Sequence, residues 1–319
     1  MRIASNHDLE TVEMRKAFVE TLIQEGNKNS RIVTVNSDLC SSMGITDFVK
    51  IFPDRSFNVG IQESNGVGVS AGLSAAGMIP FFHTFAVFAS RRVFDQAFVS
   101  CAYAGLNVKI VGGDPGVTAT TNGGTHMSFE DIALMRAIPT ARVIEFSDTT
   151  MVRKVVPQVV EHYGVDYMRL MRKCLHRIYD ESSEIIVGKA NVLREGTDVT
   201  IIACGLEVYE ALTAAQQLEE EGISARVVDM FTIKPLDNEC VIESAKKTGA
   251  IVTAENHNII NGLGSAVAEV LVENIPVPME RVGAQDEFGE VGPQNYLMER
   301  FNLTSKTIYE KAKRVISRK

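Results

Sequence analysis

The sequence lacks the cysteine spacing of a disulfide framework or a zinc site. Its 319 residues include five cysteines, which lie far apart and form no C-x-x-C pair. The N-terminal segment MRIASNHDLE also contains no apolar stretch of the kind that secretory signal peptides carry. Both absences favour a protein of the reducing cytoplasm.

A surplus of basic residues is also missing. The chain has 32 Lys and Arg against 40 Asp and Glu, a net charge of −8, which argues against non-specific binding to nucleic acid or to anionic membranes. Hydrophobic residues make up 45% and charged residues 23%, the balance of an ordinary globular protein. The length suggests two domains.

Charged residues are absent from the whole segment 64–90. A run of this length could cross a bilayer as one helix. However, it contains four glycines and Pro80, and the sequence GMIP in its middle is typical of a turn. We therefore interpret the run as a helix of small residues, a turn and a buried strand, packed against another surface such as a second chain.

Several common catalytic motifs are absent as well. The sequence has no G-x-x-x-x-G-K-[ST], no G-x-S-x-G and no H-E-x-x-H, and its six histidines show no metal-ligand spacing. The segment 262–269 (GLGSAVAE) resembles a phosphate-binding glycine turn, but it lacks the full G-x-G-x-x-G spacing and is better explained as a helix-packing turn. The motifs of ordinary hydrolases and NTPases are thus missing.

Apolar β-branched runs alternate with helical patterns along most of the chain, which predicts βαβ units and mostly parallel sheets. In the first half, strands are expected at 31–36, 79–83, 107–112, 142–146 and 166–171. Helices are expected there at 8–25, 62–77, 87–104, 128–137 and 148–162.

The polar segment 173–197 interrupts this alternation, with a short strand and a turn at its end. In the second half, strands are expected at 198–204, 224–229, 250–254 and 279–282, and helices at 207–221, 238–247, 263–274 and 304–317. The sequence therefore predicts two consecutive three-layer α/β domains with mostly parallel sheets, at 1–190 and 191–319.

Four polar or aromatic segments fall near the carboxyl ends of strands in the first domain, where open α/β sheets bind ligands. They are Asn36–Ser42, Asn58–Gly66, Thr84–Phe88 and Asp114–His126. Taken singly, each has a plain structural explanation: a capped turn, an acidic helix start, core aromatics and a helix cap. Together they predict one site at this edge.

The segments that carry this pattern resemble the transketolase family. The most specific pieces are NVGIQESNGVGVSAGL, TFAVF, NGGTH and FTIKPLD. The chain is similar to the C-terminal half of transketolase, a pyrimidine-binding domain followed by a C-terminal domain, and to the separately encoded C-terminal subunit of split transketolases. The resemblance covers nearly the whole chain and implies thiamine diphosphate as the cofactor.

The resemblance also assigns cofactor-binding residues. Glu63 corresponds to the catalytic acid that hydrogen-bonds the aminopyrimidine ring and so promotes deprotonation of the thiazolium carbon. Since no other charge follows it until Arg91, we expect a dry site that favours the neutral carboxyl. Phe85 and Phe88 would pack on the pyrimidine, Asp38 would lie near its amino side, and Arg91 stands where the family has a tyrosine.

Further positions correspond to the substrate-binding residues of the family. His126 matches the catalytic histidine that hydrogen-bonds the donor sugar, and Arg15, Ser42 and Arg172 match positions that bind the sugar phosphate. Arginine suits that role because its planar guanidinium offers paired donors. Without the resemblance, a solvated helix face for Arg15 and a surface ion pair for Arg172 would be the simpler explanations.

Two substrate positions depart from the family pattern. Asp114 aligns with a histidine that helps to hold phosphate, and an aspartate there would repel a phosphate. Asn122 aligns with an aspartate that reads a sugar hydroxyl. These changes leave the ketol-transfer residues in place. They argue against the ordinary pentose phosphates as donors and leave open a variant sugar, branched or carrying a different anion.

The family motif G-D-G…N, which holds the diphosphate and Mg²⁺, is missing from this sequence. Residues 112–114 contain the same residue types but in the order Gly-Gly-Asp. We therefore expect a partner, the N-terminal transketolase subunit, to supply that half of the site in an α₂β₂ heterotetramer built on a dimer of these chains, with no metal ligands in this chain. The second domain shows no catalytic candidates and is expected to serve assembly.

Three other functions remain open from the sequence. A β subunit of a 2-oxo acid dehydrogenase has the same domain order, although NGGTH and Arg172 argue against it. A fragment of a deoxyxylulose-phosphate synthase is a related alternative. A scaffold subunit that kept the fold without the chemistry is the non-enzymatic one, and the intact Glu63 argues against it.

Overall fold

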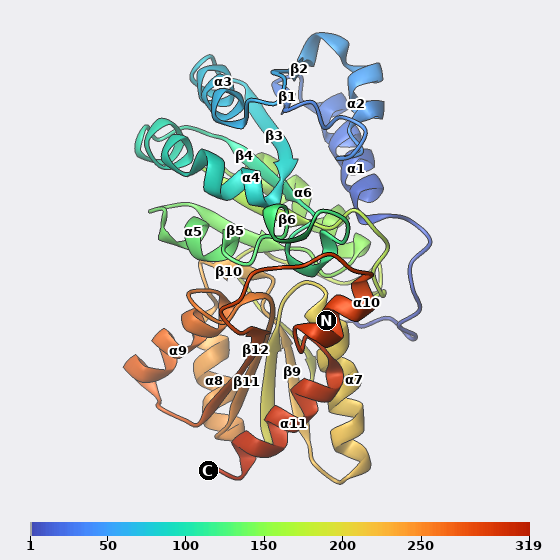
Figure 1. The fold of residues 1–319 in the computed structure, drawn as a ribbon, viewed down its shortest axis with the longest axis vertical. Helices are drawn as coiled ribbons and strands as arrows, with labels where there is room; N and C mark the ends of the chain where they lie inside the picture. The colour runs from blue at the N-terminus through green and yellow to red at the C-terminus, as the bar shows by residue number, and fades with distance from the viewer. Residues whose placement is uncertain (1) are drawn as a thin grey trace.

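The computed structural model describes residues 2–319 as two α/β domains stacked along the long axis of the molecule (Figure 1). One sheet has seven strands in the order β10-β5-β6-β4-β3-β1-β2, and the other has five in the order β12-β11-β8-β9-β7. All neighbouring strands pair in parallel except for β10 with β5 and β7 with β9. The predicted fold class is confirmed.

Each of the five strands predicted in the first half is present, and two short ones were not predicted. The strands of the first sheet are β1 (Ile32–Asn36), β2 (Ser56–Asn58), β3 (Ile79–Phe85), β4 (Lys109–Gly113), β5 (Arg142–Glu145), β6 (Asp166–Leu170) and β10 (Thr232–Lys234). The two unpredicted strands, β2 and β10, have three residues each. Such short segments carry too little alternation to stand out in the sequence.

Helices flank this sheet on both faces (Figure 1). They are α1 (Met14–Lys28), α2 (Thr46–Ile51), α3 (Glu63–Ala75), α4 (Ala86–Ser90), α5 (Asp131–Ala137) and α6 (Thr149–Glu161), with shorter helical turns η1 (Pro53–Arg55), η2 (Arg91–Val93), η4 (Gly116–Thr118) and η5 (Gly123–Thr125) and a π-helical segment η3 (Gln96–Tyr103).

Two helix predictions in the first half differ from the structure, one in extent and one in helix type. The helix expected at 8–25 begins only at Met14, because Leu9 instead forms a β-bridge with His176 and the Glu10 amide donates to the Leu175 carbonyl. The helix expected at 87–104 is helical through Tyr103, but the regular α-helix is interrupted after Ser90 (φ −116°, ψ −77°), where η2 and then the π-helical segment η3 follow α4.

The uncharged segment 64–90 forms the predicted elements, a helix (α3), a turn and a buried strand (β3), followed by the short helix α4. Gly77 makes the turn with a φ of +89°, a conformation that glycine adopts without strain. Within residues 2–319, no helix is both long and apolar enough to cross a membrane.

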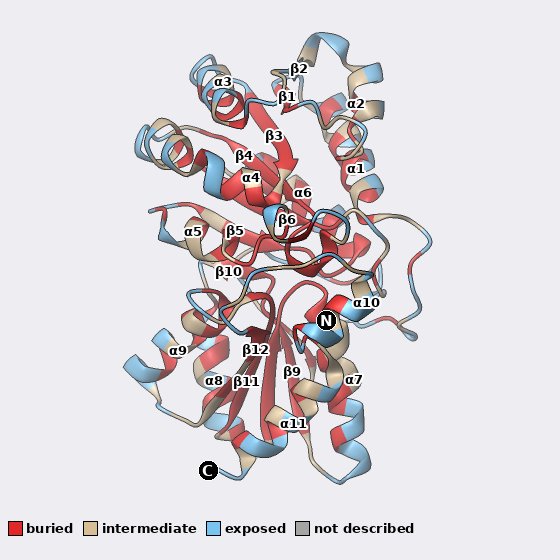
Figure 2. Ribbon diagram, viewed as in Figure 1, coloured by how far each residue is buried: buried red, intermediate tan, exposed pale blue. Residues whose placement is uncertain are grey.

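The second sheet is buried on both faces (Figure 2). Its strands are β7 (Asn191–Arg194), β8 (Val199–Ala203), β9 (Ala225–Asp229), β11 (Ile251–Asn258) and β12 (Met279–Ala284). The helices of this half are α7 (Glu207–Glu220), α8 (Asn238–Thr248), α9 (Leu263–Asn274), α10 (Gln294–Arg300) and α11 (Ser305–Ile316). Of these elements, only α10 was not predicted.

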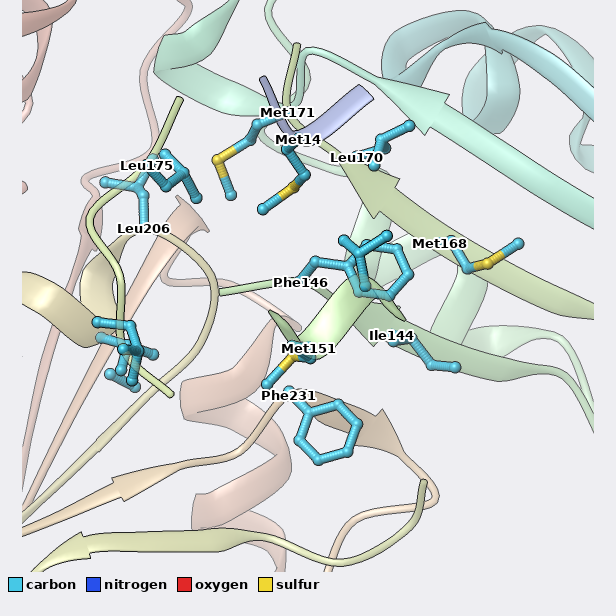
Figure 3. Close-up of a cluster of buried hydrophobic side chains, with 14 of the residues drawn as sticks. Met14, Ile144, Phe146, Met151, Met168, Leu170, Met171, Leu175, Leu206 and Phe231 are labelled. Atoms are coloured by element: carbon cyan, nitrogen blue, oxygen red, sulfur yellow. The ribbon is translucent and has the colours of Figure 1, made fainter. Parts of the chain in front are cut away.

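The two halves share a hydrophobic core. Figure 3 shows Phe231 from the second half packed near Met151 and Phe146 from the first, and Leu206, at the start of α7, near Leu175. Strand β10 adds an antiparallel edge to the first sheet by pairing Thr232 with Ile144. We propose that the domains comprise residues 1–190 and 191–319. Strand β10 then belongs to the second domain in sequence but pairs with the sheet of the first.

An ionic network is also buried at this boundary. The guanidinium of Arg169, on β6, donates to Asp131 (Nε–Oδ2 2.7 Å), to Glu145 (Nη1–Oε1 2.6 Å) and to the carbonyl of Asn256 on β11 (2.9 Å). Burial alone would raise the pKa of Asp131, but the Arg169 charge outweighs burial and holds that pKa below its usual value. The charges therefore satisfy one another out of water.

The glycine turn at 262–269 begins α9, and its free amides are occupied within the chain. The amides of Leu263 and Gly264 donate to the buried Glu255 carboxylate at 2.6 and 2.8 Å. A Cβ at Gly262 would lie 1.9 Å from Glu255 Oε2, so glycine is required there. The amides at the start of α9 therefore bind the Glu255 carboxylate of the same domain, as expected for a helix-packing turn rather than a phosphate site.

Candidate active site

Strand register brings three of the predicted site residues to one edge of the first sheet. Phe85, at the end of β3, pairs with Gly113 of β4, which in turn pairs with Leu170 of β6. Because these parallel strands end level with one another, the residues that follow them, Asp114 and Arg172, emerge beside Phe85.

Asp114 and Arg172 form an ion pair at this edge. Asp114 is buried, with a φ of +52°, and its carboxylate contacts Arg172 Nε and accepts from the Arg172 amide (3.3 Å). Burial raises the pKa of Asp114, and the Arg172 charge opposes that shift. The expected repulsion of an anion by Asp114 is thus offset by its own partner.

These residues border a small open pocket with an empty volume of about 210 Å³. Its lining residues are Phe85, Asp114, Ala119, Thr121, Asn122, His126 and Arg172. The structure therefore gathers five of the predicted site residues around one hollow, and most of the lining belongs to the loop between β4 and α5.

His126 lies against the two aromatic rings of the predicted cofactor site. Its ring centroid is 6.0 Å from that of Phe85 and 5.0 Å from that of Phe88, both edge-to-face, and its Nδ1 is 2.9 Å from Thr125 Oγ1. Partial burial and the charges of Arg92 and Arg91 lower the pKa of His126. We therefore expect a neutral imidazole at neutral pH, one that can both donate and accept.

Glu63 begins α3 and is almost fully buried, with 2% of its side chain exposed. Its Oε2 is 2.7 Å from Arg92 Nη1, and the Arg92 guanidinium lies 3.9 Å from the centre of the Phe88 ring. Glu63 is buried as expected, but Arg92 brings a positive charge to it that the uncharged run 64–90 did not predict. The break in the helix after Ser90 turns Arg92 back toward α3, a placement that spacing alone does not reveal.

Arg91 contacts the loop that carries His126 and the residues just after it. Its Nε is 2.8 Å from Glu130 Oε1, and its Nη2 donates to the Thr125 carbonyl at 3.3 Å. Arg91 thus holds Thr125, the residue next to His126. Its other partner, Glu130, was not among the predicted site residues.

The remaining predicted residues, Arg15, Ser42 and Asp38, do not line this pocket. Arg15 donates to the Ser42 carbonyl (2.9 Å) and pairs with Glu13 (2.8 Å), so Ser42 contributes its backbone and not its hydroxyl to this contact. Asp38, at the end of β1, is exposed, has a φ of +59° and exchanges hydrogen bonds with Asn58 at 3.0 and 3.1 Å.

Comparison with protein-family models gives two matches. Residues 10–177 match the transketolase pyrimidine-binding domain, and residues 188–308 match the transketolase C-terminal domain. The chain belongs to the transketolase family. The predicted resemblance is confirmed, and the pyrimidine-binding domain implies thiamine diphosphate as the cofactor.

Curated relatives and a solved structure narrow this further. The chain is 51% identical to the 6-deoxy-6-sulfo-D-fructose transketolase subunit SqwH of Clostridium sp. (strain MSTE9), covering 98% of this chain and 97% of the relative. It is 38% identical to an apulose-4-phosphate transketolase subunit of Phocaeicola vulgatus, covering 94% and 96%. A structure described as "Split gene transketolase, inactive beta4 tetramer" superimposes with a TM-score of 0.90 at 43% identity, over 96% of this chain and 99% of that one.

The protein is therefore a transketolase subunit, one part of a two-subunit enzyme, and this implies a partner that carries the rest of the enzyme. Its residues fit the aminopyrimidine half of thiamine diphosphate, because Glu63 offers a buried carboxylate whose partner Arg92 also contacts the aromatic ring of Phe88. Within residues 2–319, no three His, Cys, Asp or Glu side chains are grouped so that they could hold a metal ion.

Proposed function

We propose that this subunit supplies the pyrimidine-binding and substrate-binding half of each active site in an enzyme that moves a two-carbon ketol unit from an anionic ketose to an aldose. The observation that carries this proposal is the convergence of Phe85, Asp114, Asn122, His126 and Arg172 on one pocket, close to the Glu63–Arg92 pair. Bound thiamine diphosphate would supply the carbon nucleophile.

The chain's own residues prepare the cofactor. Glu63 would hydrogen-bond the pyrimidine ring nitrogen and could exchange a proton with it, since its carboxylate is buried at a helix start. Phe85 and Phe88 would pack on the ring and exclude water. Asp38 would lie on the amino side of the pyrimidine, and Arg91 would hold the loop that carries His126 through the Thr125 carbonyl.

The same edge of the sheet binds the sugar. His126, as a neutral imidazole, hydrogen-bonds the donor hydroxyls near the reacting carbons and carries protons there, and Asn122 reads a further hydroxyl. Arg172, Arg15 and Ser42 hold the terminal anion of the donor. We assign catalytic roles to Glu63 and His126 only.

Asp114 favours a terminal anion of low charge. Its carboxylate already neutralises Arg172, so the anion site carries less net positive charge than two free arginines would provide. A sulfonate carries a single negative charge, whereas a phosphate monoester carries about −1.5 to −2 at neutral pH. A sulfonated ketose, the substrate class in the name of the Clostridium relative, is therefore the first donor to test, and phosphorylated ketoses are the second.

The N-terminal transketolase subunit completes the site by holding the diphosphate and Mg²⁺, in an α₂β₂ heterotetramer in the cytoplasm. The outer face of α3 supports self-association, because Asn65, Gly68 and Gly72 are exposed and bring no charge to it. The β₄ tetramer named for the similar solved structure is consistent with contacts between copies of such chains. The five cysteines are all free, which suits a reducing compartment.

Reconstitution tests the proposal. The chain is co-expressed with a candidate N-terminal transketolase subunit from the same organism. Ketol transfer is then measured across a panel of sulfonated and phosphorylated ketoses with thiamine diphosphate and Mg²⁺. We expect activity from the complex and none from either chain alone. Activity of this chain alone, or full activity of a Glu63→Gln complex, would overturn the half-site mechanism.

The same assay separates the alternatives. Turnover of 2-oxo acids without ketol transfer would identify a 2-oxo acid dehydrogenase subunit. Formation of a deoxyketose from pyruvate would identify a deoxyxylulose-phosphate synthase fragment. A complex that assembles and binds thiamine diphosphate, yet is inactive on every sugar, would leave a scaffold role.

A further inference from the structure

The loop that carries His126 rests on the second domain. This loop, residues 114–126, provides Asp114, Asn122, His126 and two further residues to the pocket lining. It lies between β4 and α5 of the first domain, yet its backbone contacts residues of β11 and of the segment after β12. The shape of the pocket therefore depends on a domain from which no site residue was predicted.

One side chain makes the central contact. Asn256 is fully buried at the carboxyl end of β11, and its side-chain amide contacts two backbone groups of the loop. Its Oδ1 accepts from the Val117 amide at 2.9 Å, and its Nδ2 donates to the Pro115 carbonyl at 3.0 Å. The amide thereby satisfies a donor and an acceptor in the two residues next to Gly116.

Gly116 shows how close this approach is. It has a φ of +54°, and a Cβ placed there would lie 2.0 Å from Asn256 Oδ1. Glycine is thus required both by the backbone conformation and by the neighbouring amide. Asp114, which binds Arg172, is only two residues away.

The segment 289–292 supports the far part of the loop. The Gly292 amide donates to the Thr120 carbonyl at 3.1 Å, and a Cβ on Gly124 would lie 2.8 Å from the Gly289 carbonyl oxygen. Figure 1 shows this segment, coloured orange-red, running along the domain boundary toward α10. Backbone packs on backbone here, so no side chain in this contact is as specific as Asn256.

Asn256 is itself held rigidly. Its carbonyl accepts from Arg169, which Asp131 and Glu145 anchor within the first domain. Strand β11 and the buried ion network therefore fix the position of Asn256, and the Asn256 side-chain amide in turn fixes the loop. A side chain held in this way can transmit position at the sub-ångström level that substrate binding requires.

We propose that Asn256 is a positioning residue for the donor-sugar pocket, acting through the backbone of residues 115–117 to hold Asp114 and His126 in place. It touches neither substrate nor cofactor. The proposal rests on the proposed function for its kinetic consequences, but the contact itself can be tested without any activity.

Hydrogen exchange tests the contact directly. In the chain as expressed, Asn256→Ala removes both hydrogen bonds to the loop, and we expect faster amide exchange at residues 116–127. Asn191→Ala is a matched control, because Asn191 is also buried and donates to Tyr179 at 3.0 Å, but it contacts no residue of the loop. Unchanged exchange in the Asn256→Ala loop, or equal acceleration in both variants, would overturn the proposal.

Kinetics of the reconstituted complex test the consequence. For Asn256→Ala we expect a rise in KM for the donor ketose on the order of tenfold or more, with half-saturation by thiamine diphosphate unchanged. Asn256→Asp keeps the acceptor for Val117 and loses the donor to Pro115, so its KM should lie between those of wild type and Asn256→Ala. Loss of kcat alone, with KM unchanged, would indicate a merely structural role and contradict the proposal.

A double variant keeps the test independent of folding defects. Gly116→Ala should raise KM strongly, and adding Asn256→Ala should recover part of that loss, because the clash with Oδ1 is removed. Strictly additive effects would contradict a contact between the two positions. If the wild-type complex transfers no ketol unit at all, the proposed function fails, whereas the exchange result still decides the role of Asn256.

Discussion

Arg92 joins the buried carboxylate of Glu63 to the aromatic face of Phe88. Its Nη1 is 2.7 Å from Glu63 Oε2, and its guanidinium lies 3.9 Å from the centre of the Phe88 ring. One cation thus neutralises the proposed catalytic acid and stacks on the proposed pyrimidine wall, and the chain positions it by breaking the helix after Ser90.

The first prediction concerns this pair. Arg92→Met keeps most of the apolar stem and removes the charge, which leaves the Glu63 carboxylate buried without a counterion. We expect a loss of about 1 kcal/mol in the free energy of unfolding, limited by the 44% exposure of Arg92. Urea denaturation of Arg92→Met, Glu63→Gln and the double variant should show a non-zero coupling energy. Additive effects would show that the ion pair does not stabilise the fold. Arg91→Met is the control, because Arg91 pairs with Glu130 and should show no coupling to Glu63→Gln.

The second prediction concerns the protonation of His126. Because burial and the charges of Arg92 and Arg91 disfavour the imidazolium, its pKa should lie below that of a free histidine. NMR titration of the chain should show this, and Arg91→Gln and Arg92→Gln should each move the pKa upward. In the complex, the acidic limb of the pH–rate profile should move in the same direction. A pKa that does not respond to either variant would contradict the electrostatic cause.

The third prediction concerns stability against pH. Burial raises the pKa of Asp229 to about 7 from 3.8, and the charges of Asp148 and Glu145 act in the same direction against hydrogen bonds from Tyr179 and Ser147. The folded chain then binds this proton more tightly than the unfolded chain, so the free energy of unfolding should fall as pH rises from about 4 to about 7.

Urea denaturation across that pH range, at one protein concentration, checks the slope. Glu255, whose pKa burial likewise raises to about 7, adds to it. Asp229→Asn keeps an acceptor for Tyr179 and Ser147 while removing the titration, so the fall should become shallower. The variant Asp54→Asn, at an exposed carboxylate, should leave the slope unchanged. A steeper slope in Asp229→Asn would reverse the assignment.

The fourth prediction concerns self-association. A Cβ at Gly68 or Gly72 meets no atom within 4 Å in this chain, so its own fold tolerates a side chain there. Gly72→Arg would introduce bulk and charge on the uncharged outer face of α3. We expect weaker self-association in sedimentation velocity, with the thermal midpoint lowered by only a few degrees. An unchanged oligomeric state would place the contact elsewhere, and Glu220→Arg, on a distant helix, is the control.

Much of the fold follows from local pattern. The buried strands β1, β3, β4, β6, β8 and β11 are short runs of β-branched and aromatic residues, and the sequence places each within a few residues of its observed bounds. The elements that it misses, such as β2 and β10, are three-residue segments that exist because a neighbouring strand offers them partners.

The candidate site, like the fold, was predicted from the sequence only in part. Motif resemblance proposes Glu63, Phe85, His126 and Arg172 as site residues, and the fold places the last three around one pocket. Arg92 and Asn256 were missed because their roles depend on a broken helix and on contact between domains, neither of which leaves a local signature.

Strand β10 limits how this protein can be recombined. A chain cut near residue 190 would remove Thr232–Lys234 from the edge of β5 and expose unpaired backbone that invites association with other chains. A chimera that exchanges the second domain with that of a relative must therefore also match Thr232 to Ile144 and Lys234 to Val143. A chimera should therefore exchange both domains together, so that β10 keeps its native partner β5.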